Sequence, residues 1–370
     1  MKNAAIWFLA LSIGLFACKK ESDPQPQPGE EDQVETLGIY TLNEYTYVID
    51  ADGDLWVRGG AFSASEEVND RGYFLFDNQV RKFSYGNLSR RMYILKEDNS
   101  LWRTAERPTD ETNTSIHVKA TEKIADQVQD VQAGRGFAAF LKIDGTVWAL
   151  GENGSGEFGI GTSTYEELPL MQIADGIKKL AVGYSNIYLL KEDNTLWASG
   201  NYIYGKLGFP TDRDQKTFVK IMDEVSEVKS NGNGVMVLKT DGSAWSFGSN
   251  TNGMQGTGEA SQEPTYPHQV GTSVKQIIAM DYACFYIKTD NSLWACGNNS
   301  FGLMGMESPR NLYHYTQIAE NVSAVSEMSS NDHMVILQNG QYKMSGFNNN
   351  RQLQQSDIDS FTIFTDFETP

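Results

Sequence analysis

Six of the seven tryptophans recur at near-equal intervals, and this repeat constrains the fold more than any other feature. They are Trp56, Trp102, Trp148, Trp197, Trp245 and Trp294, separated by steps of 46, 46, 49, 48 and 49 residues. One further step of 49 residues reaches Lys343 and gives a seventh copy. Self-similarity at about 40–50 residues is typical of solenoids and propellers. Because a fixed place in every repeat is a packing place, we expect the six tryptophans to be structural.

The sequence around each tryptophan predicts a β-hairpin. The residues before it read Asp-Gly-Asp-Leu at 52–55, Asp-Asn-Ser-Leu at 98–101 and Asp-Gly-Thr-Val at 144–147. Short β-prone runs flank such turns, as at 137–142 and 146–150, and Asp-Gly favours tight hairpin turns. No repeat contains a periodic segment of helical length, which argues against helical solenoids. The pattern predicts an all-β chain, a seven-bladed β-propeller of repeats about 46–49 residues long.

Four central repeats also share a glycine frame with spacings of five and three residues. The glycines are Gly151, Gly156 and Gly159, then Gly200, Gly205 and Gly208, then Gly248, Gly253 and Gly256, then Gly297, Gly302 and Gly305. With the Asp-Gly turn and the tryptophan, this frame resembles the repeat of the regulator of chromosome condensation family. The resemblance covers about 34–370 and implies a seven-bladed propeller. The second repeat departs from the frame at Ala105, and the last places Arg351 and Gln354 at glycine positions. Only His333 keeps the histidine that the family has before its hairpin.

The C-terminal run at 361–367 predicts how the ring closes. It is β-prone and has no hairpin partner after it. Because closing the ring leaves no exposed strand edge, we expect this C-terminal strand to complete the first blade, which begins near residues 34–40.

The N-terminus resembles that of a bacterial lipoprotein. Residues 1–17 combine Lys2 with a short apolar run and end in Leu-Phe-Ala before Cys18, which predicts a signal peptide and lipidation of Cys18. Residues 18–33 form a linker rich in proline and acid, and 34–370 form the propeller. We expect an outer-membrane lipoprotein of a Gram-negative bacterium, periplasmic or surface-exposed, that meets the membrane only through its lipid anchor. An ordinary secretory signal is the alternative.

The composition excludes several classes of function. The net charge of −18 opposes the binding of a phosphate backbone, so we expect no nucleic-acid partner. Three cysteines and four histidines leave little material for a metal site, and we expect no cofactor. Residues 50–54 resemble a calcium loop, but Ala61 stands where its last acidic ligand belongs. Residues 154–159 match Gly-x-Gly-x-x-Gly without the helix that a dinucleotide site requires. We interpret both as plain loops.

Two cysteines lie in one predicted hairpin. With a two-residue turn at Asp290-Asn291, paired positions sum to 581, whereas Cys284 and Cys296 sum to 580. We therefore expect them on opposite faces of the sheet as two free thiols.

Strand polarity separates two faces of the propeller. The Asp-Gly and Asp-Asn turns carry alternating Asp and Lys, which predicts a solvated face without specific function. The glycine loops lie at the other end and carry the candidate binding residues, Tyr202, Tyr204, Phe301, Tyr313 and Tyr315, with Tyr165 and Tyr266 farther along. Exposed tyrosines are favoured in recognition surfaces, although aromatic side chains also cover blade edges.

The sequence favours a non-catalytic scaffold that binds a protein or a glycan at the cell surface through these loops. The family that it resembles includes exchange factors for a small GTPase and secreted inhibitors of β-lactamase, which implies a protein-binding role. We identify no catalytic residues. The alternative is a carbohydrate-active enzyme that uses a carboxylate pair without a recognisable local signature.

Overall fold

The structure is a computed structural model that describes residues 38–42, 45–59, 72–86, 91–104, 120–280, 282–307, 310–328, 333–349, 351–353 and 358–370. They belong to one compact unit, from Glu35 to Pro370. The signal peptide, the lipidated Cys18 and the linker predicted from the sequence lie outside the described residues. Among the helices of the described part, none is long and apolar enough to cross a membrane.

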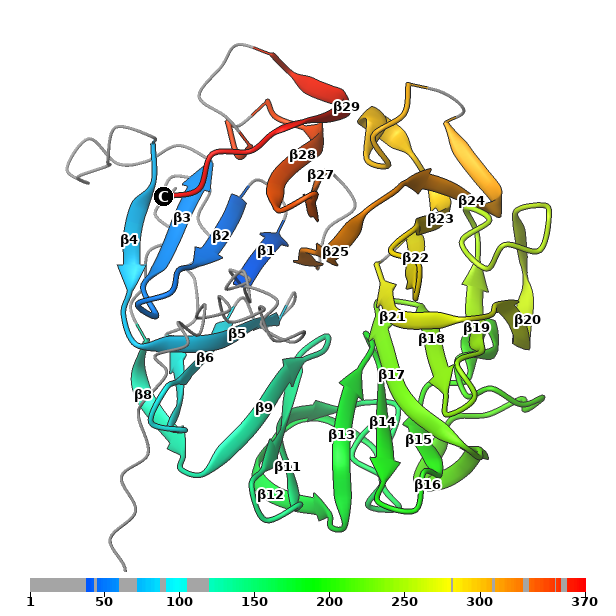
Figure 1. The fold of residues 1–370 in the computed structure, drawn as a ribbon. Coiled ribbons are helices and arrows are strands. Elements are labelled where there is room, and N and C mark those ends of the chain that lie inside the picture. The colour runs from blue at the N-terminus through cyan, green and yellow to red at the C-terminus, as the bar shows by residue number, and fades with distance from the viewer. Residues whose placement is uncertain are drawn as a thin grey trace, which may run out of the picture. The chain divides into compact units, whose positions relative to one another are not determined.

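Seven antiparallel sheets form the blades of a β-propeller, which confirms the predicted fold (Figure 1). Within each blade the strands are paired in chain order, from the innermost to the outermost. Blade 1 contains β1 (Gly38–Leu42), β2 (Tyr45–Ile49), β3 (Leu55–Gly59) and β4 (Phe74–Asp77), blade 2 contains β5 (Val80–Gly86), β6 (Arg91–Lys96), β7 (Leu101–Thr104) and β8 (Ala120–Ala125), and blade 3 contains β9 (Val128–Ala133), β10 (Phe137–Lys142), β11 (Val147–Asn153) and β12 (Thr164–Ala174).

The remaining four blades repeat this order. Blade 4 contains β13 (Ile177–Val182), β14 (Asn186–Lys191), β15 (Leu196–Gly200) and β16 (Gln215–Met222), blade 5 contains β17 (Val225–Asn231), β18 (Gly234–Lys239), β19 (Ala244–Asn250) and β20 (Ser261–Gly271), blade 6 contains β21 (Val274–Ala279), β22 (Ala283–Lys288), β23 (Leu293–Asn298) and β24 (Asn311–Ala319), and blade 7 contains β25 (Val322–Val325), β27 (His333–Gln338), β28 (Gln341–Phe347) and β29 (Ser360–Asp366). Two 3₁₀ turns, η1 (Ile203–Gly205) and η2 (Ser300–Gly302), follow β15 and β23.

The second strand of each blade is apolar on both faces because it lies between two neighbouring blades. In β14 five consecutive residues from Asn186 to Leu190 are buried, and β22 shows the same pattern. A half-buried strand would alternate between apolar and polar residues, whereas a strand covered on both faces reads as a continuous apolar run. The β-prone runs of the sequence are these doubly covered strands.

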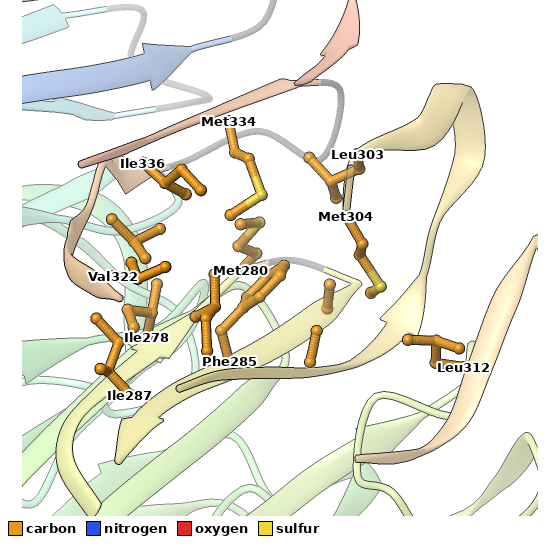
Figure 2. Close-up of a cluster of buried hydrophobic side chains, with 14 residues drawn as sticks. Ile278, Met280, Phe285, Ile287, Leu303, Met304, Leu312, Val322, Met334 and Ile336 are labelled. Atoms are coloured by element: carbon orange, nitrogen blue, oxygen red, sulfur yellow. The ribbon is translucent and has the colours of Figure 1, made fainter. Parts of the chain in front are cut away.

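The hydrophobic core is divided among the junctions between blades. Figure 2 shows the junction of blades 6 and 7, where Met280 and Phe285 approach Met334 and Ile336 from the facing sheet. Leu303 and Met304, from the loop between β23 and β24, belong to the same cluster. Each blade is therefore held by apolar side chains of its neighbours as well as by its own strand pairing.

The closure of the ring differs from the sequence-based expectation. The C-terminal strand β29 pairs with β28 and is the outermost strand of blade 7, so it does not complete blade 1. Blade 1 has its own innermost strand, β1, and a short strand β26 (Glu327–Met328) adds to β1 in parallel. The prediction was wrong because four β-prone runs per repeat already supply every strand, which leaves no vacancy for the last one.

Buried side chains complete this closure. Arg58 on β3 is fully buried, and its Nη1 donates to the carbonyl oxygen of Leu353 in blade 7 at 2.7 Å. Its guanidinium also lies 4.2 Å from the ring centre of Tyr73, whose hydroxyl donates to the carbonyl of Glu368. At the other six junctions the ring is continuous along the chain, so these contacts replace a covalent connection between blades 7 and 1.

Candidate functional site

The turn between the second and third strands holds the repeated tryptophan through a short hydrogen-bond relay. In blade 4, Asp193 Oδ1 accepts from the backbone N–H and the hydroxyl of Thr195, and Trp197 Nε1 donates to Thr195 Oγ1 at 2.8 Å. Blades 2, 3, 5 and 6 repeat it with Asp98, Ser100 and Trp102, with Asp144, Thr146 and Trp148, with Asp241, Ser243 and Trp245, and with Asp290, Ser292 and Trp294. In blade 1, Trp56 Nε1 donates directly to Asp50 Oδ2.

The lysines of these turns also contact the tryptophans. Lys191 Nζ lies 4.2 Å from the ring centre of Trp197, and Lys288 Nζ lies at the same distance from Trp294. The hydroxyl and backbone donors of Thr195 hold the pKa of Asp193 below its usual value. We call this end of the propeller the turn face. Its charged side chains and indole rings contact one another, and the tryptophans stabilise the hairpin turns.

The two motif matches are ordinary loops in this structure. Asp50 Oδ1 accepts from the backbone N–H groups of Asp52 and Asp54, so the calcium-like residues form a hairpin turn. Residues 154–159 lead into an isolated bridge at Ile160 and then into β12, not into a helix. The described residues contain no group of three His, Cys, Asp or Glu side chains arranged to hold a metal ion.

The first glycine of the frame packs against a loop of its own blade, and the second and third pack against the next blade. A Cβ on Gly151 would lie 2.4 Å from the carbonyl oxygen of Gly136, in the loop between the first two strands. A Cβ on Gly156 would lie 2.8 Å from Cα of Lys216, and one on Gly159 would lie 2.3 Å from the ring of Phe218, both on the outer strand of blade 4. The frame therefore marks three points where backbone or ring atoms leave no room for a side chain.

The same frame explains the position of Tyr315. Its ring fills the space beside Gly256, as Phe364 does beside Gly305. It also stacks on Tyr286 at 4.9 Å between ring centres, and burial raises its pKa. Tyr315 is thus a packing residue at the junction of blades 5 and 6, and its buried hydroxyl does not face solvent.

The other four candidate residues lie on the opposite end from the turns, which we call the glycine-loop face. Tyr202 is partly buried against the core shared by blades 4 and 5. Tyr204 is partly buried as well, whereas Tyr313 is 40% exposed and Phe301 is 53% exposed. Phe301 and Tyr313 both belong to blade 6, but Phe301 contacts Phe347 of blade 7 and Tyr313 lies beside Gly253 of blade 5.

Tyr204 and Phe301 share a backbone conformation that aromatic residues rarely adopt. Each lies one position before the second glycine of its frame, and φ is 65° at Tyr204 and 59° at Phe301. Left-handed φ in a bulky residue costs of order 1–3 kcal/mol and persists where the surroundings impose it. Such strain concentrates at functional sites, so an aromatic side chain held there and exposed is a marker of a contact surface.

Further apolar side chains are exposed at this end. Ile203 precedes Tyr204 in η1 and is 44% exposed, and Tyr282, which precedes β22, is 45% exposed. Tyr165 and Tyr266, named from the sequence, are 81% and 40% exposed on β12 and β20. Three of the five exposed aromatic residues in the described part of the chain thus lie on blade 6, one lies on blade 3 and one on blade 5, and blade 4 adds the exposed apolar residue Ile203.

A buried ionisable pair beneath these loops was not found from the sequence. Glu157 and Lys206 follow the second glycine in blades 3 and 4, and each is at most 5% exposed. Burial raises the pKa of Glu157 to about 7 and lowers that of Lys206 to about 8. The N–H of Ser155 donates to Glu157 Oε2 at 2.9 Å, and Lys206 Nζ donates to Asn233 Oδ1 at 3.3 Å. Their equivalents in blades 5 and 6 are Met254 and Leu303, so the sequence offers no repeated charge as a signal.

The cysteines correct one predicted register. Cys284 and Cys296 are directly paired across β22 and β23, so they share a face of the sheet. The turn has three residues between Lys288 and Ser292, not two, which moves the paired positions to a sum of 580. Both cysteines are buried free thiols, and Cys296 Sγ donates to the carbonyl of Met254 at 2.9 Å.

Comparison of the sequence with family models and with curated proteins finds no match. Solved structures do share its architecture. Prp20p from Saccharomyces cerevisiae, described with its binding properties to Gsp1p and histones, aligns with a TM-score of 0.67 at 18% identity over 85% of this chain and 86% of that one.

Two further structures agree with this comparison. Yeast RCC1 (Prp20), solved with Kap60 bound to it, has a TM-score of 0.66 at 16% identity over 97% of this chain and 91% of that one. Human WBSCR16 has a TM-score of 0.63 at 15% identity over 85% and 90%. The repeated tryptophans, the glycine frame and the seven blades together give this chain the fold of the RCC1-like propellers.

Proposed function

We propose that this protein is a cell-envelope lipoprotein that binds a protein partner, without catalysis, through the glycine-loop face of blades 4 to 6. The observation that carries the binding role is Phe301, which is 53% exposed and held at φ 59°. Phe301 contacts Phe347 of blade 7, but about half of it stays exposed at a strained φ, and such an aromatic residue supplies contact area to a partner. The partners named for the yeast propellers, Gsp1p, histones and Kap60, are proteins, which favours the same class here.

The envelope part of the proposal rests on residues 1–33. An apolar run that ends at Ala17, followed by Cys18 and a proline-rich spacer, favours lipidation and a tether. Mass spectrometry of the mature chain tests it. We expect an acylated Cys18 as the first residue, and a Cys18→Ser variant in the soluble fraction. An unmodified mature N-terminus would refute the lipoprotein without bearing on the binding face.

A photo-crosslinking amino acid placed at residue 301 of the full-length chain in its native cells tests the binding face. The matched control is residue 143, because Ile143 is an exposed apolar residue, 58% exposed, in a turn on the opposite face. We expect an adduct of defined mass from position 301 and none from position 143. In the purified complex, Phe301→Ala and Tyr313→Ala should then weaken binding without lowering the melting temperature.

Three outcomes would overturn the proposal. Equal adducts from positions 301 and 143 would show contact that is not specific to a face. Absence of an adduct at 301, with retention of the chain on a glycan array, would replace the protein partner with a carbohydrate. Cleavage of the arrayed glycans would replace the binder with an enzyme.

A further inference from the structure

A pocket of about 390 Å³ lies between blades 2 and 3, away from the loops of blades 4 to 6. Its size is in the range of pockets that hold small ligands. The apolar part of the wall comes from the outer strands and from β11, and consists of Ile124, Leu150, Leu168, Pro169 and Leu170. Gly136 and Gly151 contribute backbone, and Tyr93 contributes its ring. The pocket thus combines an apolar wall with a charged wall.

The charged wall holds three cations in a chain whose net charge is −18. Arg91, Arg103 and Lys123 line the pocket with two carboxylates, Glu122 and Glu167, and Lys123 pairs with Asp126, which is not a lining residue, at 2.6 Å. The two arginine side chains are 19% and 18% exposed, so their charged groups are held within the junction. Positive groups with apolar neighbours favour an anion that carries an apolar body.

The carboxylates leave these cations accessible to a competing anion. Arg103 Nε and Nη2 donate to Glu122 Oε2 at 3.1 and 2.6 Å, and Arg91 Nη1 lies 3.4 Å from Glu167 Oε1. The side chains of Glu122 and Glu167 are 57% and 65% exposed. Ion pairs with such an exposed partner contribute about 0–1 kcal/mol to stability, so the carboxylate of a ligand can displace Glu122 and Glu167.

The positive charges are not required by the blade architecture. Arg103 lies opposite Tyr93, and the residues at this place in the other blades are Val57, Ala149, Ala198, Ser246, Ala295 and Met344. The place of Arg91, at the start of the second strand, is taken in blades 3 to 7 by Phe137, Asn186, Gly234, Ala283 and His333. Blade 2 alone has arginine at both places.

Several other junctions are packed by a residue from the glycine loop. In blades 3, 4, 6 and 7 this loop places a fully buried apolar side chain between blades, namely Phe158, Leu207, Met304 and Leu353. The sequence of blade 2 has Ala105, Asp110 and Asn113 at the three glycine positions. Blade 2 therefore lacks the glycine frame in its sequence, and its loop at 105–119 lies outside the described residues.

We propose that this pocket binds a small organic carboxylate with an apolar body, such as an N-acylated amino acid or the last residue of a peptide. Arg103 and Arg91 take the carboxylate by charge-assisted hydrogen bonds, and Lys123 adds a third positive charge at the rim. Ile124, Leu150 and Leu168 cover the apolar body. The site is separate from the glycine-loop face of blades 4 to 6 and does not depend on the function proposed for it.

Calorimetric titration of the purified full-length chain with N-acetyl-leucine tests the proposal. N-acetyl-leucinamide has the same body without the charge, and inorganic phosphate has charge without the body. We expect heat of binding from N-acetyl-leucine, with affinity that falls as salt concentration rises, and at least about tenfold weaker binding of the other two probes. A peptide ending in leucine distinguishes a peptide source from a free acyl amino acid.

Variants link the heat to the pocket. Arg103→Gln and Arg91→Gln should each weaken binding about tenfold or more, and Lys123→Gln severalfold. The matched control is Lys220→Gln. Lys220 lies opposite Trp197 on the neighbouring strand of blade 4, as Lys123 lies opposite Trp102 in blade 2. Each lysine also forms an ion pair with the aspartate three residues later in the chain. Thermal melts of all variants identify any loss that comes from unfolding.

Four results would overturn the inference. They are no heat with N-acetyl-leucine, equal affinity for the amide, equal affinity for phosphate, and equal weakening by Lys220→Gln and Lys123→Gln.

Discussion

At the scale of single residues, two positions in this propeller are held in unfavourable states. Phe301 is an aromatic residue at left-handed φ, and His333 is an ionisable residue that is fully buried. Tyr204 in blade 4 shares the backbone conformation of Phe301, whereas no other blade begins its second strand with histidine. Each state has a measurable consequence for stability.

We predict that Phe301→Asn raises the free energy of unfolding by about 1 kcal/mol, because asparagine tolerates left-handed φ. The same change should weaken partner binding. Urea unfolding measures the first effect, with Ile203→Asn as the control. Ile203 is an exposed apolar residue in the equivalent loop of blade 4 and does not have positive φ. Equal stabilisation by both variants would show that loss of exposed apolar area, not strain, is the cause.

His333 predicts a loss of stability in acid. Burial lowers its pKa to about 3, and its Nε2 lies 3.0 Å from Thr46 Oγ1 of blade 1. The unfolded chain binds a proton at this residue near pH 6.5, whereas the folded chain does not do so until about pH 3. The free energy of unfolding should therefore fall as pH decreases from about 6.5 towards 3.

Denaturant unfolding between pH 3.5 and 8 checks this dependence against His333→Gln, which removes the titration and keeps a polar side chain at the junction. Because other groups titrate in the same range, the quantity to follow is the difference between the two proteins. A difference that does not vary with pH would contradict the assignment.

At the scale of elements, the glycine frame sets how each loop meets the next blade. We predict that Gly159→Ala lowers the free energy of unfolding by about 2 kcal/mol or more, because the new Cβ adds a clash with Phe218 to the cost of left-handed φ. Gly161→Ala is the matched control, since φ is +87° there and nothing lies within 4 Å of its Cβ. Equal losses, measured by thermal unfolding, would mean that backbone conformation alone explains the glycine.

Elements also show which parts of this structure could be predicted from the sequence. The hairpins were predictable because every repeat restates the same turn and strands, and β10 begins and ends at the predicted residues, 137 and 142. The cysteine register was not, because one extra turn residue changes the face on which every later side chain lies. Glu157 and Arg103 were missed for a different reason. Arg103 faces a pocket that residues of blade 3 also line, and Glu157 is buried near Lys206 and Asp214 of blade 4. A pattern along the chain does not contain those contacts between blades.

At the scale of the whole molecule, stability depends on one junction without a covalent connection between its blades. Arg58 of blade 1 donates a hydrogen bond across this junction to the carbonyl of Leu353. The equivalent residue of blade 7 is Ser345, whose Oγ donates to the carbonyl of Leu303 at the junction of blades 6 and 7. We predict that Arg58→Ala lowers the free energy of unfolding by about 3 kcal/mol or more, since it removes a large buried side chain and its hydrogen bond.

Ser345→Ala is the control for that prediction, and we expect it to cost about 1 kcal/mol because it deletes one hydroxyl. Chemical denaturation of both variants compares the junctions. Comparable losses of unfolding free energy in the two variants would indicate that Arg58 stabilises the closing junction no more than Ser345 stabilises the junction of blades 6 and 7.

Because each blade contains its own four strands, and only the two-residue strand β26 adds to blade 1 from the C-terminal part of the chain, the chain break can be moved to another turn between blades. Ile39 near one end of the propeller and Phe367 near the other belong to the same buried cluster. A short linker could therefore join the two ends, and new termini could be opened in any turn between blades, with the same set of side-chain contacts retained. A circular permutant opened at residues 175–176 would fold to the same ring, with the junction of blades 7 and 1 converted from a contact held by Arg58 into a continuous stretch of chain.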